Sequence, residues 1–150
     1  MNDVIIRKIT KSDKDAYFEL ADLFYHSPAV LHPVPKKNIE NTWDELMRSN
    51  EYLECFFAVK GDEPIGFMLL AYTFSQEPGG KVVWLEEIFV REQYRNRGAG
   101  KLFFKYLDEQ IVPTVSRIRL EVEPDNDRAK ALYSSLGFTS LPYEQMVREI

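Results

Sequence analysis

Apolar residues occur in short runs, or alternate with polar ones, in segments that are typical of β-strands. Residues 61–62 have the sequence Gly-Asp and predict a short hairpin. A Pro-Gly-Gly sequence at 78–80 separates the apolar segment that ends at residue 74 from the one that begins at residue 82. The predicted strands are residues 4–9, 52–60, 64–74, 82–90 and 117–123, with a final pair near 138–141 and 146–150.

Other segments repeat their apolar residues with the period of a helix. Thr10 or Ser12 caps the first helix, and a proline-rich loop over residues 27–35 separates it from the second. Asn126 is a good N-cap for the last helix, and Gly137 lies where a left-handed residue ends one. The repeated positions are Ala16, Leu20, Leu23 and Phe24, then Ile39, Trp43, Leu46 and Met47; the later helices are predicted over 102–111 and about 127–136.

Strands and helices in this order favour an α/β fold. The chain has 150 residues, of which 45% are hydrophobic, so it can bury a core but is short for two ordinary domains. We therefore predict a single domain over residues 1–150. Cys55 is the only cysteine and lies in an apolar run, which predicts a buried thiol rather than a nucleophile.

Residues 95–101 have the sequence Arg-Asn-Arg-Gly-Ala-Gly-Lys and connect a predicted strand to a predicted helix. Gly98 and Gly100 place no side chain between the backbone and a ligand, so the first N–H groups of the helix are able to face an anion. Leu102 stands where a P-loop needs a hydroxyl, and Phe103 replaces the third glycine of a dinucleotide-binding motif. The remaining pattern, Arg-x-x-Gly-x-Gly, predicts a phosphate-binding turn of another kind.

A second pattern, Asn-x-x-Ala-x-x-x-Tyr-x-x-x-Gly-Phe, extends from Asn126 to Phe138. Asn126 and Tyr133 are seven residues apart, which is about two helical turns, so they face the same side of their helix. Taken alone, Tyr133 is equally well interpreted as a core aromatic beside Leu132 and Leu136.

The two patterns together resemble the GCN5-related N-acetyltransferases, and the resemblance covers nearly the whole chain. It implies a mixed, mostly antiparallel sheet of six to seven strands, flanked by helices, whose central strands splay apart to admit the arm of acetyl-CoA. It also implies that Tyr133 gives a proton to the departing thiolate and that the acetyl group is transferred by direct attack. The implied contacts with acetyl-CoA are Ile88, Phe89, Val90, Arg95, Asn96, Arg97, Gly98, Ala99, Gly100, Lys101 and Asn126.

Glu86 is the candidate for binding the acceptor amine and accepting its proton, directly or through water. Simple alternation places it on one face of its strand, together with Trp84, Ile88 and Val90. Glu87 then lies on the opposite face, where a lysine or arginine of a helix is its expected partner. Within the family, the sequence around Glu86 most resembles diamine acetyltransferases, in which this glutamate engages the polyamine. The alternative for Glu86 is a solvated carboxylate at a strand end.

Charge is unevenly distributed along the chain. Residues 91–107 contain five basic residues and one acidic residue, whereas the whole chain has a net charge of −5, so the remainder carries −9. A basic patch confined to the predicted phosphate-binding turn suits coenzyme A, and the acidic remainder argues against nucleic acid and suits a cationic substrate. The N-terminus lacks a basic region followed by an apolar stretch, and no run approaches the ~20 residues of a membrane span. We therefore expect a cytoplasmic protein that does not associate with membranes.

The acceptor is the part of the site about which the sequence says least. His26 and His32 have no cysteine or carboxylate pair at ligand spacing, so no metal site is expected; they line the acceptor site or are ordinary loop residues. Tyr25 and Trp43 either shape the acceptor pocket or pack between helices. Two other functions stay open beside a small amine acetyltransferase: acetylation of protein lysines or N-termini, and a non-catalytic acyl-CoA-binding regulatory module. The chain is either a monomer or a homodimer.

Overall fold

The computed structural model describes residues 3–150, which form two compact units, one reaching to Leu120 and one from Glu121 to Ile150. The prediction of one domain over the chain stays a prediction. The first unit contains β1 (Val4–Lys8), α1 (Lys14–Tyr25), α2 (Lys36–Arg48), β2 (Leu53–Lys60), β3 (Glu63–Ser75), β4 (Gly80–Val90), α3 (Ala99–Tyr106) and β5 (Arg117–Leu120). Short helical turns occupy Lys11–Asp13, Glu92–Tyr94, Leu107–Ile111 and Val112–Thr114.

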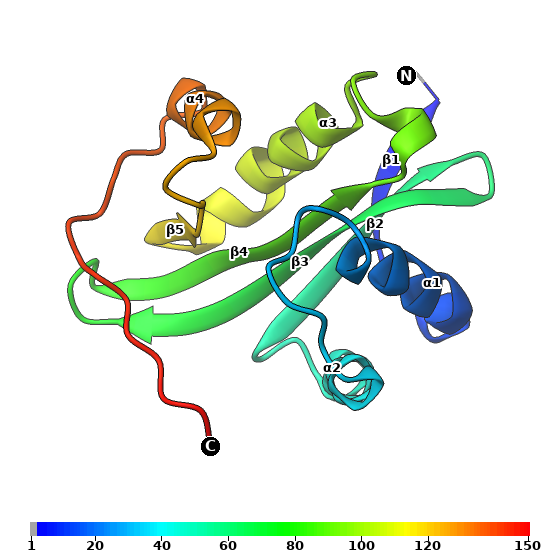
Figure 1. The fold of residues 1–150 in the computed structure, drawn as a ribbon, viewed down its shortest axis with the longest axis horizontal. Coiled ribbons are helices and arrows are strands. Elements are labelled where there is room, and N and C mark those ends of the chain that lie inside the picture. The colour runs from blue at the N-terminus through cyan, green and yellow to red at the C-terminus, as the bar shows by residue number, and fades with distance from the viewer. Residues whose placement is uncertain (1–2) are drawn as a thin grey trace. The chain divides into compact units, whose positions relative to one another are not determined.

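The sheet of the first unit has five strands in the order β1-β2-β3-β4-β5 (Figure 1). The first three pairings are antiparallel, and β4 pairs with β5 in parallel. The expected mixed, mostly antiparallel sheet is therefore confirmed, with fewer strands than the six to seven predicted. The hairpin at residues 61–62 is also confirmed, because Gly61 takes a φ of 60° between β2 and β3.

Helices cover both faces of this sheet: α1 and α2 lie on one side and α3 on the other (Figure 1). Successive residues of a strand point to opposite faces. Phe57 accordingly packs with Leu20 and Trp43 in the core beneath α1 and α2. The neighbouring Phe56 packs against Tyr106 of α3, with the two tilted rings 4.9 Å apart between centroids. Among the predicted core positions Cys55 is fully buried as expected, whereas Leu23 of α1 is exposed.

A β-bulge interrupts β4. Leu85 pairs with Leu70 of β3 and Glu87 pairs with Leu69, so Glu86 is an extra residue on β4 with no opposite residue in the ladder. An extra residue shifts the alternation of everything that follows it by one position. The bulge therefore decides which face each side chain at the end of β4 occupies.

The second unit contains α4 (Asp127–Ser135), in agreement with the predicted helix. The Asn126 side chain accepts a hydrogen bond from the Ala129 N–H at 3.1 Å, and Gly137 has a φ of 89°, so both predicted caps are confirmed. The strands predicted at 138–141 and 146–150 are absent, because the described residues after Gly137 contain no strand. Apolar residues occur there, but Pro142 lacks an N–H, and Met146 and Ile150 are exposed rather than packed on a sheet.

Candidate functional site

The turn before α3 has the left-handed backbone that its sequence predicts. Asn96 has a φ of 59° and Gly98 a φ of 91°, and α3 begins at the next residue. Glycine adopts this conformation without strain, and asparagine is among the few other residues that tolerate it. The sequence at 95–98 thus reverses the chain sharply between the end of β4 and the first turn of α3.

The first turn of α3 presents main-chain N–H groups that are suited to a phosphate. The first bond within the helix runs from the Leu102 N–H to the Gly98 carbonyl oxygen, so the N–H groups of Ala99, Gly100 and Lys101 precede it. A Cβ atom built on Gly100 would meet no atom within 4 Å, so the approach to this turn is open. N–H groups at the positive end of a helix, with basic side chains beside them, fit the pyrophosphate of coenzyme A.

Arg95 connects this turn to β4. Its Nε donates to the carbonyl oxygen of Val90 at 2.8 Å, and its guanidinium lies 5.4 Å from the centroid of the Phe89 ring. These contacts give Arg95 a role in shaping the turn. Contacts of residues 95–101 with a phosphate stay predictions.

The last five residues of β4 extend beyond its pairing with β5. The parallel ladder ends where Leu85 meets Leu120, while β4 continues along β3 to Val90. Ile88, Phe89 and Val90 lie in this part of β4, as a strand that pairs with the arm of acetyl-CoA requires. The backbone pairing itself stays a prediction.

The bulge changes the expected positions of the two acids in β4. Trp84 pairs with Ala71 and Ile88 pairs with Met68, and these two residues of β3 lie on opposite faces of the sheet. The predicted common face of Trp84, Glu86, Ile88 and Val90 is therefore wrong, because the extra residue at Glu86 shifts the alternation. Glu86 is exposed, as a residue that meets an incoming substrate must be.

Glu87 lies on the α1 and α2 face of the sheet, opposite Leu69 and on the same face as Phe89. Its partner is the hydroxyl of Tyr25, which donates a hydrogen bond to Oε1, and not the expected lysine or arginine of a helix. Burial raises the pKa of the Glu87 carboxyl to about 7; repulsion from Glu86 acts in the same direction, and the Tyr25 hydrogen bond opposes it. Burial and the bond to Glu87 also raise the pKa of Tyr25, so its hydroxyl keeps its proton.

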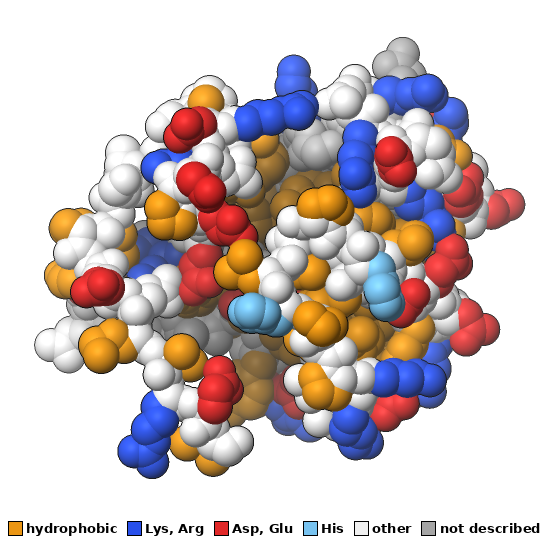
Figure 2. Space-filling view, in the orientation of Figure 1, with side chains coloured by type: hydrophobic (Ala, Val, Ile, Leu, Met, Phe, Trp, Pro, Cys, Tyr) orange, Lys and Arg blue, Asp and Glu red, His pale blue; other side chains and the backbone are white. Residues whose placement is uncertain are grey.

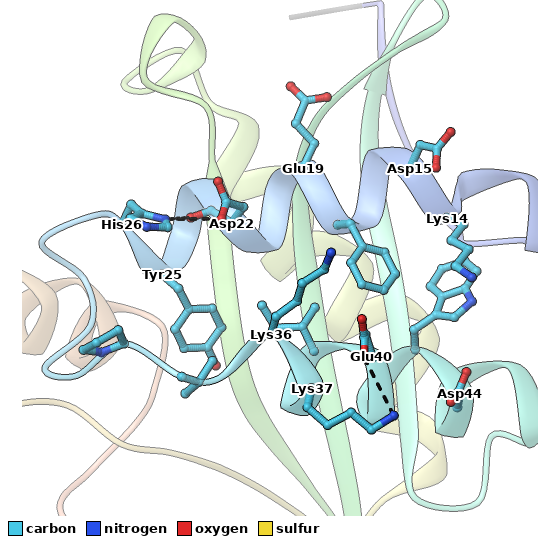
Figure 3. A pocket seen from close by; sticks show the side chains of 15 residues that line it. Lys14, Asp15, Glu19, Asp22, Tyr25, His26, Lys36, Lys37, Glu40 and Asp44 are labelled. Atoms are coloured by element: carbon cyan, nitrogen blue, oxygen red, sulfur yellow. Dashed lines mark hydrogen bonds and ion pairs between the residues drawn. The ribbon is translucent and has the colours of Figure 1, made fainter.

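Tyr25 also lines a cleft of about 920 Å³ between α1 and α2. Figure 3 shows its ring projecting from the end of α1 into the cleft and the amino group of Lys36 pointing into the space between the two helices. Trp43 lies in the wall and is 5% exposed, so it packs between the helices and also borders the cleft. Pro33 and Val34 of the proline-rich loop line the same cleft.

Both histidines lie at the surface on the face that carries α1 and α2 (Figure 2). The His26 Nδ1 lies 2.8 Å from the carbonyl oxygen of Asp22 and 3.4 Å from its carboxylate. Within residues 3–150, no three histidine, cysteine, aspartate or glutamate side chains are grouped as a metal site would require. No helix in the same residues has the length and apolar character to span a membrane.

Within the second unit, Tyr133 is half-buried and its ring lies 5.9 Å from that of Phe138. Burial raises the pKa of its hydroxyl, so the phenol holds its proton, as a proton donor must. Leu132 and Leu136 beside it are exposed, which does not favour a core position for this helix face. The roles of Tyr133 and Asn126 toward acetyl-CoA stay predictions.

Sequence reasoning missed the bulge in β4 and the contact of Glu87 with Tyr25, although a signal for the bulge was present. Two consecutive acids stand between Leu85 and Ile88 in an otherwise apolar strand, which breaks the alternation of a regular strand. A polar doublet of this kind indicates a bulge. The partnership with Tyr25 joins residues 62 positions apart and leaves no local pattern.

Comparisons with known proteins agree with this arrangement. Residues 14–138 match the acetyltransferase (GNAT) family. A thialysine N-epsilon-acetyltransferase from Caenorhabditis elegans is 30% identical over 110 residues, which cover 71% of this chain and 68% of the relative.

Solved structures give the same fold. The structure of a possible acetyltransferase from Clostridium difficile 630 has a TM-score of 0.81 at 20% identity, covering 98% of this chain and 97% of the other. AAC(6')-Iy in complex with the bisubstrate analogue CoA-S-monomethyl-acetylneamine has a TM-score of 0.77 at 20% identity, covering 98% of each chain. The chain thus belongs to the GNAT family of acetyltransferases, and it transfers an acetyl group from acetyl-CoA to an amine.

Proposed function

We propose that the acceptor is a small molecule with a primary amine, such as a polyamine or a lysine-like diamino acid. The observation that carries this proposal is the pair of acids at the β4 bulge, placed where the β4–β5 ladder has ended. A carboxylate at the point where the thioester is expected attracts an ammonium group. The similarity to an enzyme whose name specifies thialysine as its substrate supports the same class of acceptor.

The cleft between α1 and α2 favours a small acceptor over a protein lysine or an N-terminus. It has a volume of about 920 Å³, and residues of the proline-rich loop form part of its wall. Pockets of about 300–1,000 Å³ are typical of small-molecule sites. Tyr25 borders the cleft and donates a hydrogen bond to Glu87, so one side chain connects the wall of the cleft with an acid of β4.

In this proposal Glu86 binds the ammonium group of the acceptor and Tyr133 gives a proton to the thiolate that leaves. Glu86 is exposed and lies just beyond the ladder, so a substrate amine is able to reach it. In the same proposal, main-chain N–H groups at the end of β4 stabilise the oxyanion of the tetrahedral intermediate.

The test is release of coenzyme A thiol from acetyl-CoA, measured with spermidine, lysine, thialysine, an aminoglycoside and a lysine peptide. We expect turnover with the small amines and a KM that rises with salt, because exposed charges are screened over about 8 Å at physiological ionic strength. Glu86→Gln should raise the KM for these amines and flatten its salt dependence. Turnover of the lysine peptide alone would refute the small acceptor, and an unchanged KM in Glu86→Gln would remove Glu86 from the site.

A further inference from the structure

Glu87 differs from the other well-shielded carboxyls of the first unit in having no cation beside it. Asp13 forms an ion pair with Arg7 at 2.8 Å, and Glu54 pairs with Lys8 at the same distance. No ion pair of residues 3–150 includes Glu87, whose hydrogen-bond donor is the neutral hydroxyl of Tyr25. A carboxylate taken from water without a counter-ion is costly, and a cation that arrives beside it is held strongly.

The surroundings of Glu87 allow its carboxylate to gain or lose a proton near neutral pH. The titratable groups that face it are Tyr25 and Tyr17 from α1, Cys55 from β2 and Glu86 from β4, and none of them is a cation. Burial raises the pKa of the Cys55 thiol, which keeps its proton at neutral pH. With its own pKa near 7, Glu87 exchanges a proton in the range where enzymes work, as an efficient general base does.

Two observations connect Glu87 with the region where the acceptor is proposed to bind. The bulge sets it next to the exposed Glu86, just after the β4–β5 ladder ends, and Tyr25 connects it to the wall of the cleft. The Tyr25 ring is fixed in turn by an edge-on contact with Phe24 at 5.0 Å between centroids. The hydroxyl of Tyr25 therefore holds one oxygen of Glu87 in place and leaves the carboxylate able to take up a proton at the other.

We propose that Glu87 is the base of the transfer reaction and that Tyr25 is its positioning residue, an inference that rests on the small-amine function proposed above. Glu86 attracts the ammonium group, and one N–H bond of that group breaks as its proton passes to the Glu87 carboxylate. The freed electron pair of the nitrogen forms the new C–N bond to the thioester carbon, and the C–S bond breaks with its electrons on sulfur. The thiolate takes up a proton from Tyr133, which regains the second proton that the nitrogen loses, and Glu87 returns the first to solvent.

The test compares variants of the full chain over pH 5.5 to 9, with saturating acetyl-CoA and the best amine of the wild type. We expect wild-type kcat/KM to fall below about pH 7. Glu87→Gln should lower kcat/KM at pH 7.5 by roughly 10² to 10⁴ and remove this acidic limb. Tyr25→Phe should move the limb to higher pH, because the hydroxyl lowers the pKa of Glu87 and its loss raises that pKa.

A matched pair on the α3 face provides the control. The Tyr72 hydroxyl donates to Glu54 at 2.9 Å, so Tyr72→Phe and Glu54→Gln make the same chemical changes away from α1. Both should keep the wild-type pH profile. The role of Glu87 is overturned if Glu87→Gln keeps the acidic limb and a kcat/KM within threefold of the wild type. If Glu87→Gln does not fold, a Tyr25→Phe variant whose kcat/KM falls at the same pH as that of the wild type overturns the role of Glu87 equally. A wild type that is inactive on every amine overturns the small-amine function as well.

Discussion

Replacing Glu87 by glutamine should make the folded protein more stable at high pH, independently of any effect on catalysis. Burial raises the pKa of this carboxyl from 4.5 to about 7, so the folded state prefers the neutral acid more than the unfolded chain does. The stability that this preference contributes is fully present below pH 4.5, and it is lost as the pH rises through about 7. Glutamine has nearly the same shape and no charge, so it removes this dependence.

The size of the effect follows from the two pKa values. A carboxyl whose pKa moves from 4.5 to about 7 changes the free energy of unfolding by at most about 3 kcal/mol. Part of this change has already occurred at pH 5. We therefore expect the difference in unfolding free energy between Glu87→Gln and wild type to grow by about 2 kcal/mol between pH 5 and pH 8.

Urea unfolding of both proteins at several pH values measures this difference, and subtraction removes the contribution of every other titrating group. Glu109→Gln changes an exposed glutamate in the helical turn after α3. The difference in unfolding free energy between this variant and wild type should therefore not change with pH. If the curves of wild type and Glu87→Gln ran parallel from pH 5 to pH 8, Glu87 would not be a buried, unpaired acid. The argument for its role as a base would then lose its physical premise.

Three further predictions concern Gly66, Gly100 and Tyr133. A Cβ on Gly66 would collide with the carbonyl oxygen of Phe89, so Gly66→Ala should destabilise the chain by roughly 1–3 kcal/mol in the same unfolding assay. Gly100→Val should keep the fold, because its Cβ meets open space, yet lose acetyl-CoA binding by calorimetry; wild-type binding would contradict the phosphate-binding role of this turn. Tyr133→Phe should leave acetyl-CoA binding intact and lower turnover by roughly 10² to 10⁴. A normal rate with chemistry limiting would return Tyr133 to a packing role.

The elements that the sequence predicted well are those defined by local signals. Asn126 and Gly137 mark the two ends of α4, and the glycines at 98 and 100 mark the turn into α3. Each signal acts through the backbone of its own neighbourhood, because a cap bonds residues three positions away and a positive φ favours glycine or asparagine wherever it occurs. Such features require no knowledge of the rest of the fold.

The parts that the sequence did not predict depend on distant partners. Whether residues 138–141 and 146–150 form strands depends on a neighbour whose backbone pairs with them, and apolar content does not specify one. The bulge at Glu86 likewise exists only relative to β3, since one strand carries a residue more than the other. The hydrogen bond between Tyr25 and Glu87 joins the last residue of α1 to strand β4, and the two residues are 62 positions apart in the sequence.

Strand β4 connects the two parts of the proposed site. Its end, through Val90 and Arg95, holds the turn that precedes α3, and its bulge holds the two acids. Glu86 and Val90 are four positions apart, which in an extended strand is about 13 Å. Without the extra residue, strict alternation would turn the acid at 87 toward α3 and away from Tyr25. The bulge therefore decides which of the two glutamates lies on the α1 and α2 face, where the base of the reaction is proposed.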